Sequence, residues 1–180
     1  MWRLYRCPHT LKETTIFNSN YTNQLLQLID DIIDISRIEA GQLQIKNHKV
    51  NVIQILNDVV KTHREKLRHS YKNNLNIILK NEHDNLIIDV DPIRLTQILS
   101  NLIGNSTKFT EDGSITVSYS KKSNSEIQFS VADTGIGIPE KDQKLIFDAF
   151  TQADGSSIRE YEGTGLGLAI TQSLIKMHKG

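Results

Sequence analysis

The apolar residues from about Leu25 onward recur at the spacing of an α-helix. They form two neighbouring stripes, one from Leu25, Leu28, Ile32 and Ile35 and one from Leu26, Ile29 and Ile33. A double stripe is typical of a helix that packs on more than one partner, although an ordinary core helix explains it about as well. Gly41 is well placed to end this helix, because glycine readily adopts the left-handed conformation that closes many helices.

Further along the chain, helical and strand-like patterns alternate. Asn51 is expected to cap a helix that reaches about Leu67, and Asp91 with Pro92 marks the start of another that runs to about Phe109. Strand-like stretches lie at 76–79, 86–90, 114–120 and 126–131, the last two forming a hairpin. A short helix over 140–147, a loop over 151–162 and a helix from about Thr164 follow. The interleaving predicts an α/β or α+β class, with one sheet covered by helices on one face.

Composition excludes several classes of protein. The 180 residues fit one domain with an appendage, and 21 Lys and Arg balance 21 Asp and Glu, so bulk charge does not favour nucleic acid. One helix face carries Lys61, Arg64, Arg68 and Lys72, which a solvated surface explains better than a nucleic-acid patch. The lone Cys7 excludes an internal disulfide. No apolar run approaches the ~18 residues of a membrane span and no signal peptide is found, so we expect a cytoplasmic domain.

The helix after Pro92 carries an unusual polar triplet near its C-terminal end. Asn101, Asn105 and Lys108 follow one another at helical spacings of four and three, so they share one face. Amide oxygens suit a hard cation such as Mg²⁺ that also binds phosphate and water, and a lysine can then contact phosphate. A polar surface face explains the triplet about as well.

A second unusual stretch, DTGIGIP at 133–139, directly follows a strand. Gly135 and Gly137 allow a sharp turn and close approach to a ligand, and the Asp133 carboxylate can accept a hydrogen bond from an amine such as that of adenine. The simpler interpretation is a strand-to-helix turn. The stretch is not the dinucleotide-binding fingerprint, which needs a third glycine at a set distance.

A third stretch, GTGLGL at 163–168, leads into the last helix. Glycines at a helix N-terminus expose N–H groups where the helix dipole favours anions, which suits phosphate. The long loop before it is typical of a functional lid or a disordered segment. Phe147 and Phe150 flank the start of this loop and are placed to anchor it.

Taken in order, these stretches resemble the ATP-binding domain of sensor histidine kinases, within the gyrase, heat-shock chaperone, histidine kinase and mismatch-repair superfamily. RLTQILSNLIGNSTKFT is similar to the N box, VADTGIGIP to the first glycine box, IFDAFTQ to the F box and GTGLGLAI to the second glycine box. LLQLIDDIIDISRIEAG is similar to the second helix of the dimerisation and phosphoacceptor hairpin. The resemblance implies an α+β two-layer sandwich, with a mixed sheet covered on one face by helices and preceded by one long helix. Residues 21–41 would belong to the hairpin, 42–180 to the ATP-binding domain, and 1–20 stay unassigned.

The resemblance also implies roles for single residues. Asn105 would ligate Mg²⁺, with Asn101 assisting near the phosphates, and Lys108 would contact phosphate; these three form the expected catalytic set. Asp133 would accept a hydrogen bond from the adenine amino group. The remaining residues that the resemblance places around ATP are Phe109, Gly135, Gly137, Ile138, Phe150, Arg159, Gly163, Thr164, Gly165, Leu166, Gly167 and Leu168.

Two departures from the family pattern affect the expected activity. None of the six histidines lies in the phosphoacceptor motif, and the sequence stops where the family continues into closing strands. We therefore expect the catalytic part of a kinase that passes the γ-phosphoryl of Mg-ATP to a histidine on a missing helix, and from there to a response regulator receiver domain. The parent is expected to be a homodimer, a hybrid kinase by its motif style, and either cytoplasmic or anchored in the inner membrane through a segment absent here; nucleic acid is not an expected partner.

Two alternatives remain open. A hydrolase or conformational clamp of the same superfamily places a glutamate four residues before the metal-binding asparagine, and this chain has Asn101 there, which cannot take a proton from water. A nucleotide-binding interaction module without catalysis is the other.

Overall fold

The computed structural model describes residues 10–72, 74–81, 85–123, 126–151 and 164–178. The chain divides into two compact units, Met1–Leu43 and Gln44–Gly180. The first contains helix α1, Thr10–Glu39. This helix begins at Thr10, before the Leu25 start that the apolar spacing predicted. The residues in front of Leu25 are mostly polar, so the helix continues there without an apolar stripe that the spacing could have shown. The predicted stop is confirmed: Gly41 has a φ of 64° and the Gln42 N–H donates to the Arg37 carbonyl at 2.8 Å.

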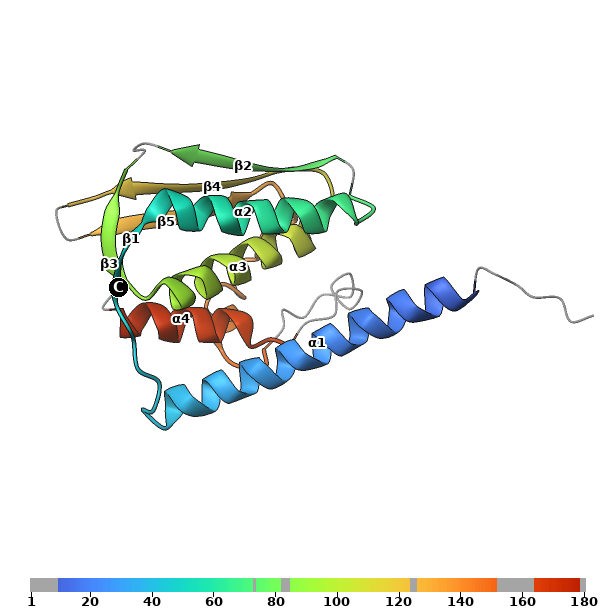
Figure 1. Cartoon of the computed structure of the whole chain (residues 1–180), viewed down its shortest axis with the longest axis horizontal. Helices are drawn as coiled ribbons and strands as arrows, with labels where there is room; N and C mark the ends of the chain where they lie inside the picture. Colours follow the sequence, from blue (N-terminus) through green and yellow to red (C-terminus); the bar gives the residue numbers. More distant parts are fainter. Residues whose placement is uncertain (1–9, 73, 82–84, 124–125, 152–163, 179–180) are drawn as a thin grey trace, which may run out of the picture. The chain divides into compact units, whose positions relative to one another are not determined.

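The second unit contains a three-stranded sheet with helices packed beside it, and a separate two-stranded ribbon at its edge (Figure 1). Its elements are β1 (His48–Asn51), α2 (Val52–Arg68), β2 (Leu75–Asn81), β3 (Ile87–Val90), α3 (Pro92–Phe109), β4 (Gly113–Lys121), β5 (Ile127–Asp133), the 3₁₀ turn η1 (Leu145–Phe147) and α4 (Gly167–Met177). Strand β4 lies between β2, with which it runs parallel, and β5, with which it forms the predicted antiparallel hairpin. The mixed sheet is therefore confirmed, but β1 and β3 form a separate antiparallel ribbon.

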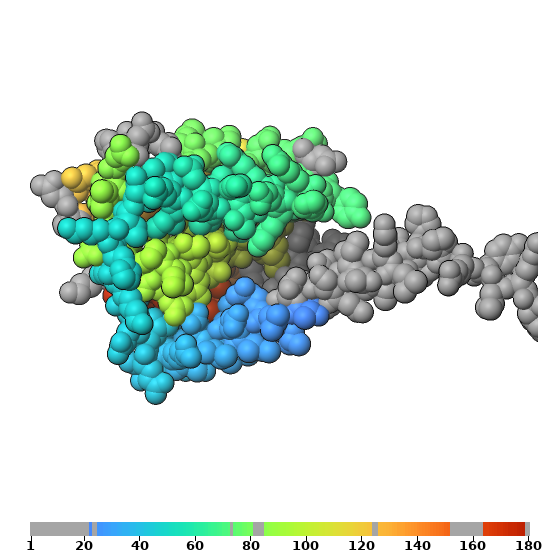
Figure 2. Space-filling model, in the orientation of Figure 1, coloured from blue at the N-terminus to red at the C-terminus, as the bar shows by residue number. Residues whose placement is uncertain are grey.

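The core lies between this sheet and helices α2 and α3. Along β4, Ile115, Val117 and Tyr119 are buried and alternate with less buried polar residues, as a strand with one covered face requires. They meet apolar residues of both helices, including Leu56 and Leu99, which are fully buried. In the space-filling view, the side chains of α2 and α3 close over one face of this unit (Figure 2).

Side chains of neighbouring residues start both long helices, as predicted. The Asn51 side chain accepts from the Ile53 N–H at 3.1 Å, and Asp91 accepts from the N–H groups of Ile93, Arg94 and, from outside the helix, Lys46. Burial alone would raise the pKa of the Asp91 carboxyl. The three N–H donors and the Arg94 charge outweigh burial and hold this pKa below its usual value.

The basic face expected on α2 is only partly solvated. The Arg64 guanidinium donates to the Ile77 carbonyl from two nitrogens, at 3.0 and 2.7 Å, and so ties α2 to β2. Lys72 is also bound to backbone carbonyls, whereas Lys61 and Arg68 are exposed. Half of this face thus serves the packing of the unit.

His63 is buried in the contact between α2 and α3. Its Cε1 lies 3.8 Å from where a Cβ on Gly104 would stand, an ordinary contact distance, so the ring packs directly against α3. Burial, together with the nearby Lys66 charge, lowers the pKa of His63 from 6.5 to about 4. The ring is therefore neutral at physiological pH.

Two predicted helices differ from those observed. The helix expected over 140–147 is a series of turns that ends in η1, because this stretch has no apolar face to bury: Asp142 is its one buried residue. The last helix begins at Gly167 and not near Thr164, since Gly165 has a φ of 70°, which a right-handed helix excludes. In the part of the chain that the structure describes, no helix is long and apolar enough to cross a membrane.

Candidate functional site

Helix α3 connects the three unusual stretches of the sequence. Asn101, Asn105 and Lys108 are all half-buried on this helix, as their spacing predicted. Its middle contacts the first turn of α4, and its C-terminal half contacts the end of β5. The elements that carry the second and third stretches are thus held by a single helix.

Asn101 joins α3 to α4. Its Nδ2 donates to the Gly167 carbonyl at 3.2 Å and to Thr171 Oγ1 at 3.5 Å. A Cβ added to Gly167 would stand 3.6 Å from the Asn101 Cγ, so the two helices approach closely here. The amide therefore fixes the N-terminal end of α4, where a helix leaves its first N–H groups without partners inside the helix.

Asn105 and Lys108 lie further along α3. Among the described residues, no side-chain hydrogen bond forms at Asn105, although its amide is half-buried. The Lys108 ammonium lies 4.9 Å from the centre of the Phe109 ring, which orients the lysine by a cation–π contact. The Phe109 carbonyl accepts from the Ile136 N–H at 3.3 Å and so joins this end of α3 to the loop after β5.

Asp133, at the end of β5, is held at both carboxylate oxygens. Ser106 Oγ donates to its Oδ2 at 2.8 Å, and the Gly135 N–H donates to its Oδ1 at 3.0 Å. The side chain is nevertheless solvent-exposed. These two bonds fix the direction of the carboxylate and leave it accessible to a ligand, which a carboxylate can serve because each oxygen accepts more than one bond.

Gly135 is required by the space around it. An added Cβ would collide with the Phe109 carbonyl oxygen and would lie 2.8 Å from Thr110 Oγ1. Gly137 is different, because the surrounding space is open and only its φ of 71° favours glycine. Thr110 Oγ1 is buried without a hydrogen-bond partner among the described residues. The loop and the end of α3 therefore fit together closely on one side and are open on the other, where Ile138 is 48% exposed.

The third stretch begins beside Phe150. Phe150 has a φ of 62°, rare for a bulky residue, and its N–H donates to the Gly165 carbonyl at 3.1 Å. A Cβ on Gly165 would stand 3.1 Å from the Phe150 backbone. These contacts bring the two ends of the intervening loop together. Arg159, Gly163 and nearly all of the expected lid lie outside the described residues.

The start of α4 has the form expected of an anion site. Thr164 Oγ1 accepts from the Leu166 N–H at 3.2 Å, and Leu166 is buried. The helix begins at Gly167, and Leu168 is half-buried in its first turn. The N–H groups of this first turn carry the positive end of the helix dipole.

Sequence reasoning missed two residues of this site, Ser106 and Thr171. Both are buried hydroxyl residues within helices, where serine and threonine have no special propensity. A signal was present for Ser106, which directly follows Asn105 within the polar stretch. Nothing in the sequence indicated that it faces Asp133.

The ligands available to a metal ion are few. The described residues contain no group of three or more His, Cys, Asp or Glu that could hold one. A hard cation at this site would therefore take most of its oxygen ligands from phosphate and water, and the Asn105 amide fits as the protein ligand.

Comparisons with known proteins show what the chain is similar to. Residues 90–180 match the family described as histidine kinase-, DNA gyrase B-, and HSP90-like ATPase. The chain is 43% identical over 157 residues to the signal transduction histidine-protein kinase BarA of Escherichia coli K12, covering 85% of this chain and 17% of BarA. It is 41% identical over 158 residues to the circadian input-output histidine kinase CikA of Synechococcus elongatus, covering 87% of this chain and 21% of CikA. The chain thus spans about a fifth of the length of these relatives.

Solved structures show the same fold. Full-length ShkA in complex with AMPPNP superimposes with a TM-score of 0.78 at 28% identity, covering 97% of this chain and 35% of ShkA. The nucleotide-free catalytic domain of the histidine kinase ThkA gives a TM-score of 0.61 at 26% identity, covering 73% of this chain and 80% of that domain. The expected α+β fold with a mixed sheet is confirmed.

Proposed function

Because the chain belongs to the histidine kinase-, DNA gyrase B-, and HSP90-like ATPase family, we propose that it is the ATP-binding catalytic part of a sensor histidine kinase that uses ATP with Mg²⁺. The γ-phosphoryl of ATP would pass to a histidine of the phosphoacceptor hairpin and then to a response regulator receiver domain. Phosphoryl transfer depends mainly on positioning and charge neutralisation, which the residues of this site can supply.

The observation that carries this proposal is that α3 binds both Asp133 at the end of β5 and the first turn of α4. Ser106 orients the Asp133 carboxylate at 2.8 Å, and Asn101 binds the first turn of α4 at 3.2 Å. The carboxylate would accept from the adenine amino group, while the α4 N-terminus would bind phosphate. One rigid helix would thereby hold the recognition of the base and of the phosphates in a fixed relation.

The remaining site residues take supporting roles in the proposal. Asn105 would hold Mg²⁺, which neutralises phosphate charge when bound. Lys108 would contact phosphate and Phe109 would line the base pocket. Arg159 would add a phosphate contact from the loop before α4.

The first unit supports a role beside a second helix. Five large apolar residues of α1 are at least 42% exposed: Leu25, Leu26, Ile29, Ile32 and Ile33. Such a stripe is expected to be covered by a partner. We assign it to the hairpin of the parent kinase, through which the parent would form a homodimer.

The contact of Asn101 argues against the hydrolase alternative. A general base for water must accept a proton, and an amide cannot do so near neutral pH. The Asn101 Nδ2 instead donates to a carbonyl of α4, a bond that a carboxylate could not make.

Titration calorimetry with ATP and GTP tests the proposal. The unchanged chain should bind ATP more tightly than GTP, because guanine carries a carbonyl oxygen where adenine carries the amino group that Asp133 would accept from. Asp133→Ala should weaken ATP binding about ten- to a hundredfold, the effect of losing a hydrogen bond to a charged group. Asp89→Ala, which removes an exposed carboxylate of β3, is the matched control and should bind ATP normally. Equal affinities of the unchanged chain for ATP and GTP would refute the assignment of Asp133.

A further inference from the structure

The C-terminal end of α3 lacks the usual helix cap. The last four carbonyls of any α-helix have no partner inside the helix, and a left-handed glycine commonly arranges the chain so that they find one. Here the C-cap residue Thr110 is extended, with φ −118° and ψ 118°, and no glycine follows until Gly113. The carbonyls of this last turn therefore need donors from elsewhere in the fold.

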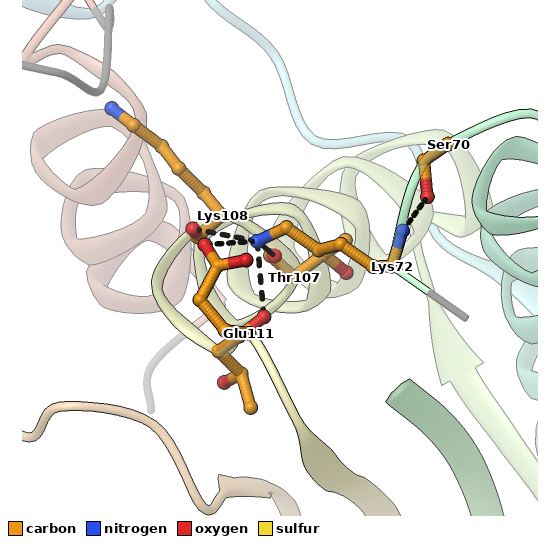
Figure 3. A network of polar contacts seen from close by, with 6 residues as sticks. Ser70, Lys72, Thr107, Lys108 and Glu111 are labelled. Carbon is orange, nitrogen blue, oxygen red and sulfur yellow. Dashed lines mark hydrogen bonds and ion pairs between the residues drawn. The ribbon is translucent and has the colours of Figure 1, made fainter. Parts of the chain in front are cut away.

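Lys72 supplies those donors. Its Nζ lies 2.9 Å from the Thr107 carbonyl oxygen, 3.1 Å from that of Lys108 and 3.0 Å from that of Thr110, with the Glu111 carboxylate 3.1 Å away (Figure 3). The side chain is 20% exposed, so these bonds are shielded from water. An ammonium group here also faces the negative end of the α3 dipole, which it stabilises.

The turn that carries Lys72 is itself ordered by hydrogen bonds. Ser70 Oγ donates to the Leu67 carbonyl at 2.8 Å, at the end of α2, and accepts from the Lys72 N–H at 3.3 Å. The Leu75 N–H, at the start of β2, donates to the Lys72 carbonyl at 3.4 Å. The turn between α2 and β2 thus presents the lysine at a set position against the end of α3.

The turn that Lys72 binds, residues 107–110 at the end of α3, is also the part of α3 that faces the proposed nucleotide site. The Lys108 carbonyl accepts a hydrogen bond from Lys72, while the Lys108 ammonium extends in the opposite direction (Figure 3). Phe109 lies between Lys108 and Thr110, two of the three residues that Lys72 binds, and its carbonyl accepts from the Ile136 N–H of the loop after β5. The bond from Ile136 holds Phe109 without the help of Lys72, so the loss of Lys72 would first move Lys108.

We propose that Lys72 is a positioning residue for nucleotide binding: it holds the last turn of α3 so that Lys108 and Asn105 face the phosphates of ATP. This inference rests on the proposed function. Lys72 itself does not contact the nucleotide. Its effect should accordingly fall on the triphosphate and much less on adenosine, which depends on Asp133, a residue held separately by Ser106 and Gly135.

The test compares Mg-ATP and adenosine binding by calorimetry in variants of the whole chain. Lys72→Met keeps the length of the side chain and removes its donors, and it should weaken Mg-ATP binding about tenfold, the usual effect of losing a residue that orients a ligand group. Adenosine affinity should change much less. Lys72→Arg, which keeps charge and donors, should restore most of the Mg-ATP affinity. Lys61→Met, at an exposed lysine of α2, is the control and should bind both ligands normally.

Several outcomes would overturn the inference. Equal losses for Mg-ATP and adenosine, or no rescue by Lys72→Arg, would mean that Lys72 only stabilises the fold. Unchanged Mg-ATP binding by Lys72→Met would refute the positioning role while leaving the proposed function intact, whereas an unchanged chain that binds neither ligand would refute both. Should Lys72→Met fail to fold by circular dichroism, Lys72→Gln, which keeps a donor without the charge, replaces it in the same comparison.

Discussion

Mild acid should destabilise the second unit through His63. The ring is buried between α2 and α3, and its pKa is lowered to about 4, first by burial and then by Lys66. In the unfolded chain the same ring has a pKa near 6.5. Between these values the unfolded state binds a proton that the folded state does not, so stability is greatest above pH 6.5 and falls as the pH drops toward 4.

The size of the effect follows from the two pKa values. A tenfold difference in proton affinity corresponds to about 1.4 kcal/mol, so the whole shift amounts to roughly 3 kcal/mol, of which about 2 kcal/mol is lost between pH 7 and 5. Asp91 also contributes to acid sensitivity, because its pKa is lowered in the fold. Its contribution is lost only as the pH falls below the ordinary carboxyl value of 3.8, which lies outside this window.

Urea denaturation followed by circular dichroism at several pH values measures this loss. The unchanged chain should lose about 2 kcal/mol of unfolding free energy between pH 7 and 5, whereas His63→Leu should lose much less over the same range, whatever its stability at pH 7. His69→Leu, at the exposed C-cap of α2, is the matched control and should keep the slope of the unchanged chain. The same slope for His63→Leu and the unchanged chain would show that His63 does not cause the acid sensitivity.

Three further predictions concern the proposed nucleotide site. Gly135→Ala should abolish ATP binding, because the added methyl group would collide with the Phe109 carbonyl. Gly137→Ala has open space around it and should lower the unfolding free energy by only about 1 kcal/mol, because of its left-handed φ. Thermal denaturation with and without ATP compares the two variants, and equal behaviour would contradict the difference in packing. Asn105→Ala should weaken ATP binding more with Mg²⁺ than with EDTA, because a cation ligand is lost; the same loss in both conditions would make Asn105 structural. When the chain alone is incubated with γ-labelled ATP, it should bind the nucleotide without acquiring an acid-labile label. A phosphoacceptor hairpin of the parent kinase, supplied as a separate protein, should be labelled weakly, since the transfer is then bimolecular. Strong labelling of the chain alone that disappears when one of the chain's six histidines is changed would show that the chain contains its own acceptor.

The parts of the fold that were predictable depend on neighbours in the sequence. Asn51 and Asp91 cap helices through N–H groups two or three residues away, and Gly41 ends α1 through its own φ. These interactions are visible in a short window of sequence. The prediction of a helix over 140–147 was wrong because it depended on distant contacts. Such a helix needs a buried apolar face, and the tertiary structure does not provide one.

The candidate site was predictable as a set of residues but not as an arrangement. The glycine-rich stretches and the polar face of α3 were visible from their spacing alone. The bond from Ser106 to Asp133 joins residues 27 positions apart, and the bonds from Lys72 reach residues 35 to 38 positions away. No local pattern specifies such pairs, and Lys72 in particular was interpreted as part of a solvated face.

Because α3 binds both the Asp133 carboxylate and the start of α4, this helix fixes the distance between them. Ser106, which orients the carboxylate, follows Asn101, which holds the start of α4, by five residues. At 1.5 Å of rise per residue, these anchor points are separated by about 7.5 Å along the helix axis. An α-helix neither stretches nor shortens easily, so this interval does not adapt to the ligand. Molecules would be sorted by the length between their base and their anionic end, independently of which base they carry. Inserting or deleting one residue between the two anchors would also rotate one anchor about 100° around the helix relative to the other, so one of the two contacts would be lost.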